Sequence, residues 1–151
     1  MTNHIFTNIH VLDCSGADPF DAEVEIKGNR IHKISTTPIA RMDQTVIDGQ
    51  GCTLMPGLVE AHAHASFTDI NVFEDIGDTP PEEHTLLTAH FARFLFDAGF
   101  TSLFGAASAK PRVEIAVRNF INDGMMVGPR MLCASPELTV TGNLGDVAMR
   151  H

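Results

Sequence analysis

The feature that most constrains the fold is a change of rhythm after Pro56-Gly57. From there to about residue 134, short apolar runs alternate with longer amphipathic runs. Short apolar runs bounded by turn residues are typical of buried strands, and the longer runs are typical of helices. Strands that alternate with helices of this length imply βαβ units and a parallel sheet. The sequence therefore predicts an α/β fold for residues 56–151.

The expected elements of this region are three strands, at 58–65, 100–104 and 130–134, and two helices. The first helix starts at the capping box Thr79-Pro80-Pro81-Glu82, which has proline at the first helical position, and stops at Gly99. The second spans 111–123 and is followed by Gly124. A closed (β/α)8 TIM barrel needs eight strands and typically about 250 residues. The region is thus either a small three-stranded α/β domain or part of a barrel.

The first 55 residues are expected to form a small β module. Two strand-like runs, 23–27 and 30–34, are joined by Gly28-Asn29, which favours a β-hairpin because both residues tolerate a positive φ. A further short strand is expected at 45–48, and Asp48-Gly49-Gln50-Gly51 is expected to turn the chain before residues 52–55.

Composition excludes several classes of protein. The chain has 151 residues, of which 44% are hydrophobic and 19% charged, and its net charge is −9. An acidic chain without a basic cluster argues against nucleic acid or an anionic membrane surface as a partner. No apolar run approaches the roughly 18 residues of a membrane span, and no export signal is recognisable at the N-terminus. A cytoplasmic location is therefore expected.

The three cysteines favour a reduced protein. Cys14, Cys52 and Cys133 are far apart and odd in number, and none forms a CxxC pair. Reduced thiols are expected, with Cys52 and Cys133 packed as small hydrophobic residues.

Two histidines on the first strand of the α/β region are the strongest chemical signal. Side chains at i and i+2 of a strand point to the same face, so His62 and His64 project together, along with Glu60. Two imidazoles one strand repeat apart can reach one divalent ion. Taken alone, His-x-His also describes two surface or hydrogen-bonded histidines. Here it follows Pro-Gly and a buried apolar run, a context that favours a metal site.

The stretch 47–64, which ends in Pro-Gly-Leu-Val-Glu-Ala-His-Ala-His, resembles the entry to the barrel in the amidohydrolase superfamily. The segments 98–102 and 124–130 are similar to later landmarks of its imidazolonepropionase-like and Xaa-Pro dipeptidase-like branch. The resemblance implies an N-terminal fragment. Residues 1–55 would belong to a β-sandwich that strands from the far C-terminus complete, and residues 56–151 would begin a TIM barrel.

By this resemblance His62 and His64 bind a divalent metal, with zinc preferred and one or two ions in the complete enzyme. The remaining ligands are a carboxylated lysine, two histidines and an aspartate, and none of these positions exists in this chain. Lys110 comes too early to be the bridging lysine. The implied reaction is attack of metal-activated water on a non-peptide or dipeptide-like amide. No catalytic residue is expected within the chain, and the chain alone is expected to be inactive.

Two acidic residues are weaker candidates. Glu60 departs from the aspartate usual in the family, and it is either a carboxylate that supports the metal ligands or a buried acid paired with an arginine. The loop at 142–146 is similar to a pocket-lining Gly-Gly-His-Gly-Asp loop, with Leu144 in place of the histidine, so only Asp146 is carried over. His84 and His90 are interpreted as ordinary surface or half-buried histidines.

Two alternatives remain open. One is a deaminase of the same superfamily, with a single metal ion and no bridging lysine. The other is a non-catalytic fragment or binding module that keeps the start of the fold without its chemistry. The resemblance also leaves a homo-oligomer open for the complete enzyme.

Overall fold

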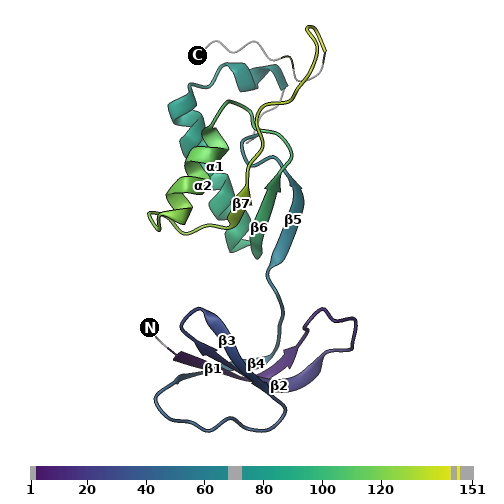
Figure 1. The fold of residues 1–151 in the computed structure, drawn as a ribbon, viewed down its shortest axis with the longest axis vertical. Coiled ribbons are helices and arrows are strands. Elements are labelled where there is room, and N and C mark those ends of the chain that lie inside the picture. The colour runs from purple at the N-terminus through teal and green to yellow at the C-terminus, as the bar shows by residue number, and fades with distance from the viewer. Residues whose placement is uncertain (1–2, 68–72, 144–145, 147–151) are drawn as a thin grey trace. The chain divides into compact units, whose positions relative to one another are not determined.

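A computed structural model of the chain describes residues 3–67, 73–143 and 146. By its internal contacts the chain divides into an N-terminal unit, Met1–Pro56, and a C-terminal unit, Gly57–His151 (Figure 1). Each unit has its own sheet and its own hydrophobic core.

The N-terminal unit is a sheet of four strands in the order β3-β2-β1-β4. The strands are β1 (Asn3–Val11), β2 (Phe20–Lys27), β3 (Arg30–Ser35) and β4 (Thr45–Leu54). Strands β2 and β3 pair antiparallel from Lys27↔Arg30 onward, which confirms the predicted hairpin. Strand β4 pairs parallel to β1.

The prediction of a turn at 48–51 is wrong, because β4 runs through this segment as one bulged strand. Asp48 Oδ1 accepts hydrogen bonds from Asn8 Nδ2 at 2.9 Å and from the Gln50 N–H at 2.8 Å. Gln50 has a φ of 53°, and the ladder with β1 resumes at Cys52. Asp and Gly are turn residues in isolation, but the neighbouring strand offers a ladder that absorbs the extra residue as a bulge.

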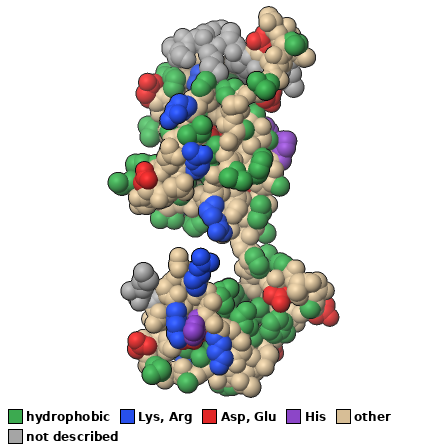
Figure 2. Space-filling model, in the orientation of Figure 1, with side chains coloured by type: hydrophobic (Ala, Val, Ile, Leu, Met, Phe, Trp, Pro, Cys, Tyr) green, Lys and Arg blue, Asp and Glu red, His purple; other side chains and the backbone are tan. Residues whose placement is uncertain are grey.

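One region of the N-terminal sheet is hollow and apolar. Its cavity of about 310 Å³ is lined by Phe6, Val24, Ile31, Ile34 and Leu54, among others. Ile31 and Ile34 on β3 are 63% and 44% exposed. Hydrophobic side chains also appear on the face of this unit seen in Figure 2.

The C-terminal unit is a parallel three-stranded sheet in the order β5-β6-β7 with helices between its strands, which confirms the predicted α/β fold. Its elements are β5 (Leu58–Ala63), the short 3-10 helix η1 (Phe73–Gly77), α1 (Pro81–Asp97), β6 (Phe100–Gly105), α2 (Val113–Asn122) and β7 (Arg130–Leu132).

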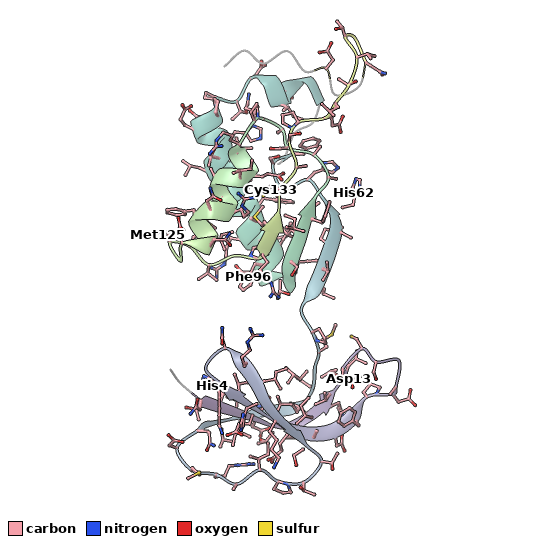
Figure 3. The ribbon with its side chains drawn as sticks, in the orientation of Figure 1. His4, Asp13, His62, Phe96, Met125 and Cys133 are labelled. Carbon is pink, nitrogen blue, oxygen red and sulfur yellow. The ribbon has the colours of Figure 1, made fainter. Side chains whose placement is uncertain are left out.

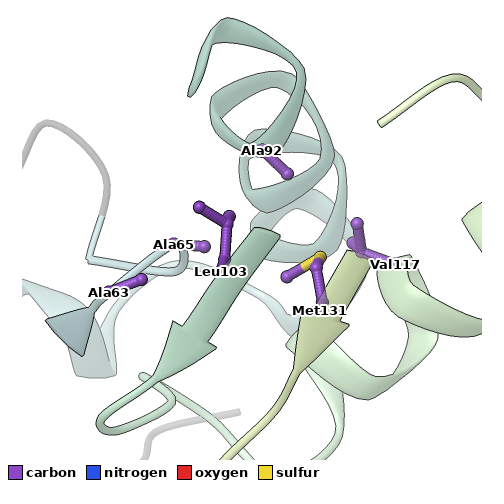
Figure 4. Packing of buried hydrophobic residues seen from close by; sticks show 6 residues of the cluster. All are labelled: Ala63, Ala65, Ala92, Leu103, Val117 and Met131. Carbon is purple, nitrogen blue, oxygen red and sulfur yellow. The ribbon is translucent and has the colours of Figure 1, made fainter. Parts of the chain in front are cut away.

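Both helices of this unit pack against the same face of the sheet. The buried cluster combines residues of all three strands with one residue from each helix, and Figure 4 shows them converging. Its members are Ala63, Ala65, Ala92, Leu103, Val117 and Met131. Phe104 and Leu132 follow core residues on β6 and β7 and are 53% and 64% exposed. The helices therefore cover one side of the sheet only.

The ends of α1 were predicted with partial success. The helix begins at Pro81, as the proline signal indicates, but Pro80 occupies the N-cap position and no side-chain hydrogen bond caps the helix, so the capping role given to Thr79 is wrong. Gly99 has a φ of +98°, and its N–H donates to the Phe96 carbonyl at 3.0 Å. This left-handed glycine ends the helix as predicted.

The expectation that the first strand of this unit is buried is wrong for most of its length. Leu58 and Val59 are 42% and 66% exposed, Ala61 is exposed, and Ala63 is the buried residue of β5. The reason is the position of β5 at the edge of the described sheet, where helix packing reaches only its last residue. An apolar sequence predicts burial only if the fold supplies neighbours on both sides of the strand.

Of the two cysteines predicted to pack as small hydrophobic residues, one does so and the other does not. All three thiols are free, and Cys133 packs half-buried against the core of the C-terminal unit. Cys52 is exposed, so its predicted packing is wrong: it lies after the bulge on β4, which is an edge strand of its sheet. Among the described residues, no helix is long and apolar enough to cross a membrane.

Candidate metal centre

His62 and His64 lie at the carboxyl end of β5, where the structure brings their rings together. The Nε2 atoms of the two rings are 3.2 Å apart, and the ring centroids are 5.0 Å apart. His62 is exposed and His64 is half-buried. Figure 3 shows His62 beside the end of the strand. The carboxyl ends of parallel strands are where α/β enzymes hold their sites.

The spacing of these two nitrogens fits a shared metal ion. Imidazole nitrogens bind zinc at about 2.0–2.1 Å. Two such bonds whose nitrogens are 3.2 Å apart enclose an angle of about 100°, close to that of tetrahedral coordination. Without a metal, one Nε2 of the pair must carry a proton that the other accepts. The two Nε2 atoms are thus close enough for one ion to contact both.

The ring of His64 is held by its neighbour in the turn that follows β5. It stacks on Phe67 with centroids 4.5 Å apart and planes 24° apart. Its other nitrogen, Nδ1, is buried and has no hydrogen-bond partner among the described residues. When Nε2 binds a metal, Nδ1 carries the ring proton, and metal-binding histidines usually donate that proton to an acceptor.

Glu60 contacts the backbone of the histidine segment. Its Oε1 accepts a hydrogen bond from the N–H of His62 at 3.0 Å. The ladder pairs Glu60 with Leu103 of β6 and shifts register before Ala63. The strict two-residue alternation predicted for this strand is therefore interrupted, although the two imidazoles still converge.

The structure does not bring Asp146 or Lys110 to the histidine pair. Asp146 Oδ2 accepts from the Gly142 N–H at 2.6 Å, and the Asp146 N–H donates to the Asn143 carbonyl at 3.0 Å, so Asp146 closes its own loop. Leu144, at the centre of that loop, lies outside the described residues. The Lys110 side chain is buried, and its Nζ donates to the Gly77 carbonyl at 3.2 Å.

A buried polar cluster surrounds Ser66 in the turn that follows β5, and the sequence did not predict it. Ser66 is fully buried, and its Oγ and N–H donate to Glu114 Oε1 at 2.8 and 3.2 Å. His84 Nε2 lies 2.5 Å from the Ser66 carbonyl, which can only accept, so this nitrogen carries a proton. His84 is 2% exposed, which contradicts its interpretation as a surface or half-buried histidine.

Glu114 is the most perturbed acid of this cluster. Burial raises the pKa of its carboxyl above the usual range, and the hydrogen bonds from Ser66 partly offset that rise. Its second oxygen, Oε2, is buried without a hydrogen-bond partner among the described residues. The signal available in the sequence was slight: a polar residue two positions after His64, and a glutamate in the first turn of α2.

The described residues contain no group of three or more histidine, cysteine, aspartate or glutamate side chains that could hold a metal ion. A catalytic zinc requires about three protein ligands and a water. Two histidines alone therefore fall short of such a ligand set.

No protein-family model matches the chain. Among curated proteins it is 38% identical, over 82 residues, to a 5'-deoxyadenosine deaminase of Methanothermobacter thermautotrophicus; the match covers 54% of this chain and 18% of the relative. It is 34% identical, over 82 residues, to a 5-methylthioadenosine/S-adenosylhomocysteine deaminase of Haloquadratum walsbyi, again covering 18% of the relative. The chain therefore matches less than a fifth of the length of these relatives.

Solved structures match over more of the chain. An amidohydrolase crystal structure is 27% identical, with a TM-score of 0.77 over 89% of this chain and 32% of that one. A prolidase complexed with N-methylphosphonate-L-proline is 24% identical, with a TM-score of 0.83 over 96% of this chain and 35% of that one, a likeness of fold. The likeness in sequence and the likeness in fold agree: over part of their length, the chain resembles proteins of the amidohydrolase superfamily.

Proposed function

We propose that His62 and His64 are two ligands of a divalent-metal site in a hydrolase of carbon–nitrogen bonds. The observation that carries the proposal is the 3.2 Å separation of their Nε2 atoms at the carboxyl end of β5. Zinc is the preferred metal, although imidazole also suits several other transition metals. Further ligands would come from outside this chain.

We propose that residues 56–151 are the first βα units of a TIM barrel. The strands follow one another in the order β5-β6-β7, and both helices pack against one face. Successive strands with all helices on one side are the arrangement of a (β/α)8 barrel, whereas a doubly wound sheet has helices on both faces. The exposed Phe104 and Leu132 are then residues of the barrel interior.

Residues 1–55 are proposed to be part of a β-sandwich. The apolar hollow on the N-terminal sheet and the exposed Ile31 and Ile34 support this proposal, because a single sheet needs a second layer to bury such a surface.

The chemistry follows from the site and the family. A bound zinc ion lowers the pKa of a coordinated water to about 7, so the reaction needs no activated side-chain nucleophile. His62 and His64 would hold the metal, and Glu60 would fix the backbone of His62 through its hydrogen bond. The pocket role of Asp146 rests on the resemblance of its loop alone. With two ligands, the chain by itself is expected to bind metal and to turn over no substrate.

The substrate class is a small molecule with an amide, dipeptide-like or aminopurine-type carbon–nitrogen bond. The similarity of segments 98–102 and 124–130 to the Xaa-Pro dipeptidase-like branch favours a dipeptide-like amide. The two curated relatives are deaminases, and their 38% and 34% identity favours deamination as the second candidate reaction. In both reactions His62 and His64 would hold the metal, and the metal would supply the activated water.

Zinc titration of the chain tests the site. Histidine ring resonances are followed by NMR, and the dissociation constant is measured by calorimetry for the wild type, His62→Ala, His64→Ala and His90→Ala. His90 is an exposed histidine on α1 and serves as the matched control. We expect each of the first two variants to weaken zinc binding by at least about tenfold, since even outer residues of metal sites contribute that much.

His90→Ala should bind zinc as the wild type does. Equal affinity in all four proteins, or shifts spread evenly over all histidine rings, would show that zinc binds nonspecifically and would overturn the proposed site.

A further inference from the structure

We propose that Glu114 is a positioning residue for the His62–His64 pair and that it acts through Ser66. This proposal rests on the proposed function, because Glu114 can position metal ligands only if His62 and His64 bind a metal. The effect of Glu114 on the turn that follows β5 can be measured without metal. Glu114 lies in the first turn of α2, 48 positions from Ser66 along the chain.

Ser66 is the point where three other segments hold the turn that follows β5. Its Oγ donates to Glu114 Oε1 at 2.8 Å and accepts the Ala109 N–H at 2.8 Å. Its N–H donates to the same carboxylate oxygen, and its carbonyl accepts the proton of His84 Nε2. Every polar group of this fully buried serine is therefore engaged, so the turn cannot move without breaking hydrogen bonds in a place that excludes water.

The same turn carries the ring of His64. Ser66 lies two positions after His64, and the next residue, Phe67, contacts His64 twice. The Phe67 N–H donates to the His64 carbonyl at 3.0 Å, and the two rings stack. A shift of Ser66 therefore moves both the backbone and the ring partner of His64. An ångström of displacement is enough to spoil a 3.2 Å ligand spacing.

The Glu114 carboxylate occupies a narrow space that requires glycine at position 105. An alanine Cβ at Gly105 would lie 2.7 Å from Glu114 Oε2, 3.1 Å from the Leu132 carbonyl oxygen and 3.2 Å from the Ala134 nitrogen. Glycine at 105 thus leaves room for the acid against β6. A buried carboxylate with one unpartnered oxygen costs stability. An apolar side chain would fill such a place at a lower cost, so packing alone does not explain a glutamate.

The test compares Glu114→Ala and Glu114→Gln with Val117→Ala in the full chain. Glutamine keeps an oxygen that accepts both Ser66 hydrogen bonds. Val117 is buried one turn further along α2, and its apolar side chain forms no hydrogen bond with Ser66. Its truncation should therefore destabilise the unit and leave the hydrogen bonds of Ser66 in place. Two quantities are measured: hydrogen exchange of the Phe67 amide in the metal-free protein, and the zinc dissociation constant.

We expect Glu114→Ala to speed Phe67 exchange beyond the change that its lower global stability explains, and to weaken zinc binding by about tenfold or more. Glu114→Gln should stay within about threefold of the wild type on both measures, since it keeps the acceptor. Val117→Ala should exchange faster only in proportion to its lower stability, with zinc affinity unchanged. If Glu114→Ala does not fold, Glu114→Asp, which withdraws the carboxylate by one methylene, takes its place.

The proposal is overturned if the alanine or aspartate variant behaves like Val117→Ala on both measures, or if Glu114→Gln is as impaired as Glu114→Ala. If His62 and His64 do not bind the metal, the result is different: His62→Ala would bind zinc as tightly as the wild type. In that case Phe67 exchange still decides whether Glu114 holds the turn.

Discussion

Replacing Gly57 with alanine is expected to destabilise the C-terminal unit, because the new methyl group would overlap a side chain on the neighbouring strand. A Cβ at this position would lie 2.1 Å from Thr101 Oγ1, 2.2 Å from Cγ2 and 2.7 Å from Cβ. Rotation about χ1 moves the first two atoms, but Thr101 Cβ is fixed to the backbone of β6. The Leu58 N–H, which donates to the Gly99 carbonyl at 2.9 Å, holds the two segments at this distance.

The magnitude follows from the distance. Carbon atoms in contact lie about 3.5–4.0 Å apart, so the two strands must separate by roughly 1 Å. Overpacking of this kind costs about 1–3 kcal/mol. For a unit of this size each kcal/mol lowers the melting temperature by about 4–8 °C, so we expect a fall of at least about 4 °C.

The assay uses a feature of this chain. It contains no tryptophan and no tyrosine, so fluorescence is a poor probe. Both α-helices of the described residues belong to the C-terminal unit, and the helical signal in far-ultraviolet circular dichroism therefore reports the unfolding of that unit.

Thr101→Gly is the matched partner, because it removes all three overlapping atoms. Alone it should cost about 0.5–1 kcal/mol, as glycine does within a strand. Combined with Gly57→Ala, it should recover about 1 kcal/mol or more relative to the sum of the single changes. An unchanged melting temperature for Gly57→Ala, or strict additivity of the two changes, would refute the reasoning.

Two further outcomes are expected in solution. Hydrogen bonding to Arg41 lowers the pKa of Glu23, so this contact stabilises the fold above pH 4.5 and is lost as the pH falls through the lower folded pKa. The Ile39 amide donates to Glu23 at 2.7 Å, and its NMR shift should titrate with a midpoint below 4.5. This transition should be absent in Glu23→Gln. Burial raises the pKa of the Cys133 thiol to about 11, so a thiol reagent at pH 8 should modify the two exposed cysteines quickly and Cys133 slowly, and three equal rates would contradict this assignment.

Local chemistry explains what could be predicted about the fold. Gly99 ends α1 because a left-handed residue there satisfies the last carbonyl groups of the helix, whatever the rest of the chain does. The hairpin at Gly28-Asn29 forms for a similar reason, since its turn and its flanking strands are adjacent in sequence. The alternation of strands and helices after Gly57 likewise depends on periods that are visible in the sequence itself.

Long-range contacts explain where prediction failed. The segment around Asp48 has turn residues, and only its pairing with β1 makes it a bulged strand. Leu58 and Val59 are apolar, and only their place at a sheet edge leaves them exposed. His84 has no ligand-type spacing, and only the approach of the Ser66 carbonyl gives it a buried partner.

The sequence by itself determined that His62 and His64 form a pair, because residues two positions apart in one short segment are always close neighbours. Only the tertiary structure decided what holds that pair in place. Glu114 reaches Ser66 across 48 positions of sequence, a contact that exists because α2 packs against the same face of the sheet as α1. A carboxylate and a hydroxyl so far apart carry no signal until folding excludes water from the space between them.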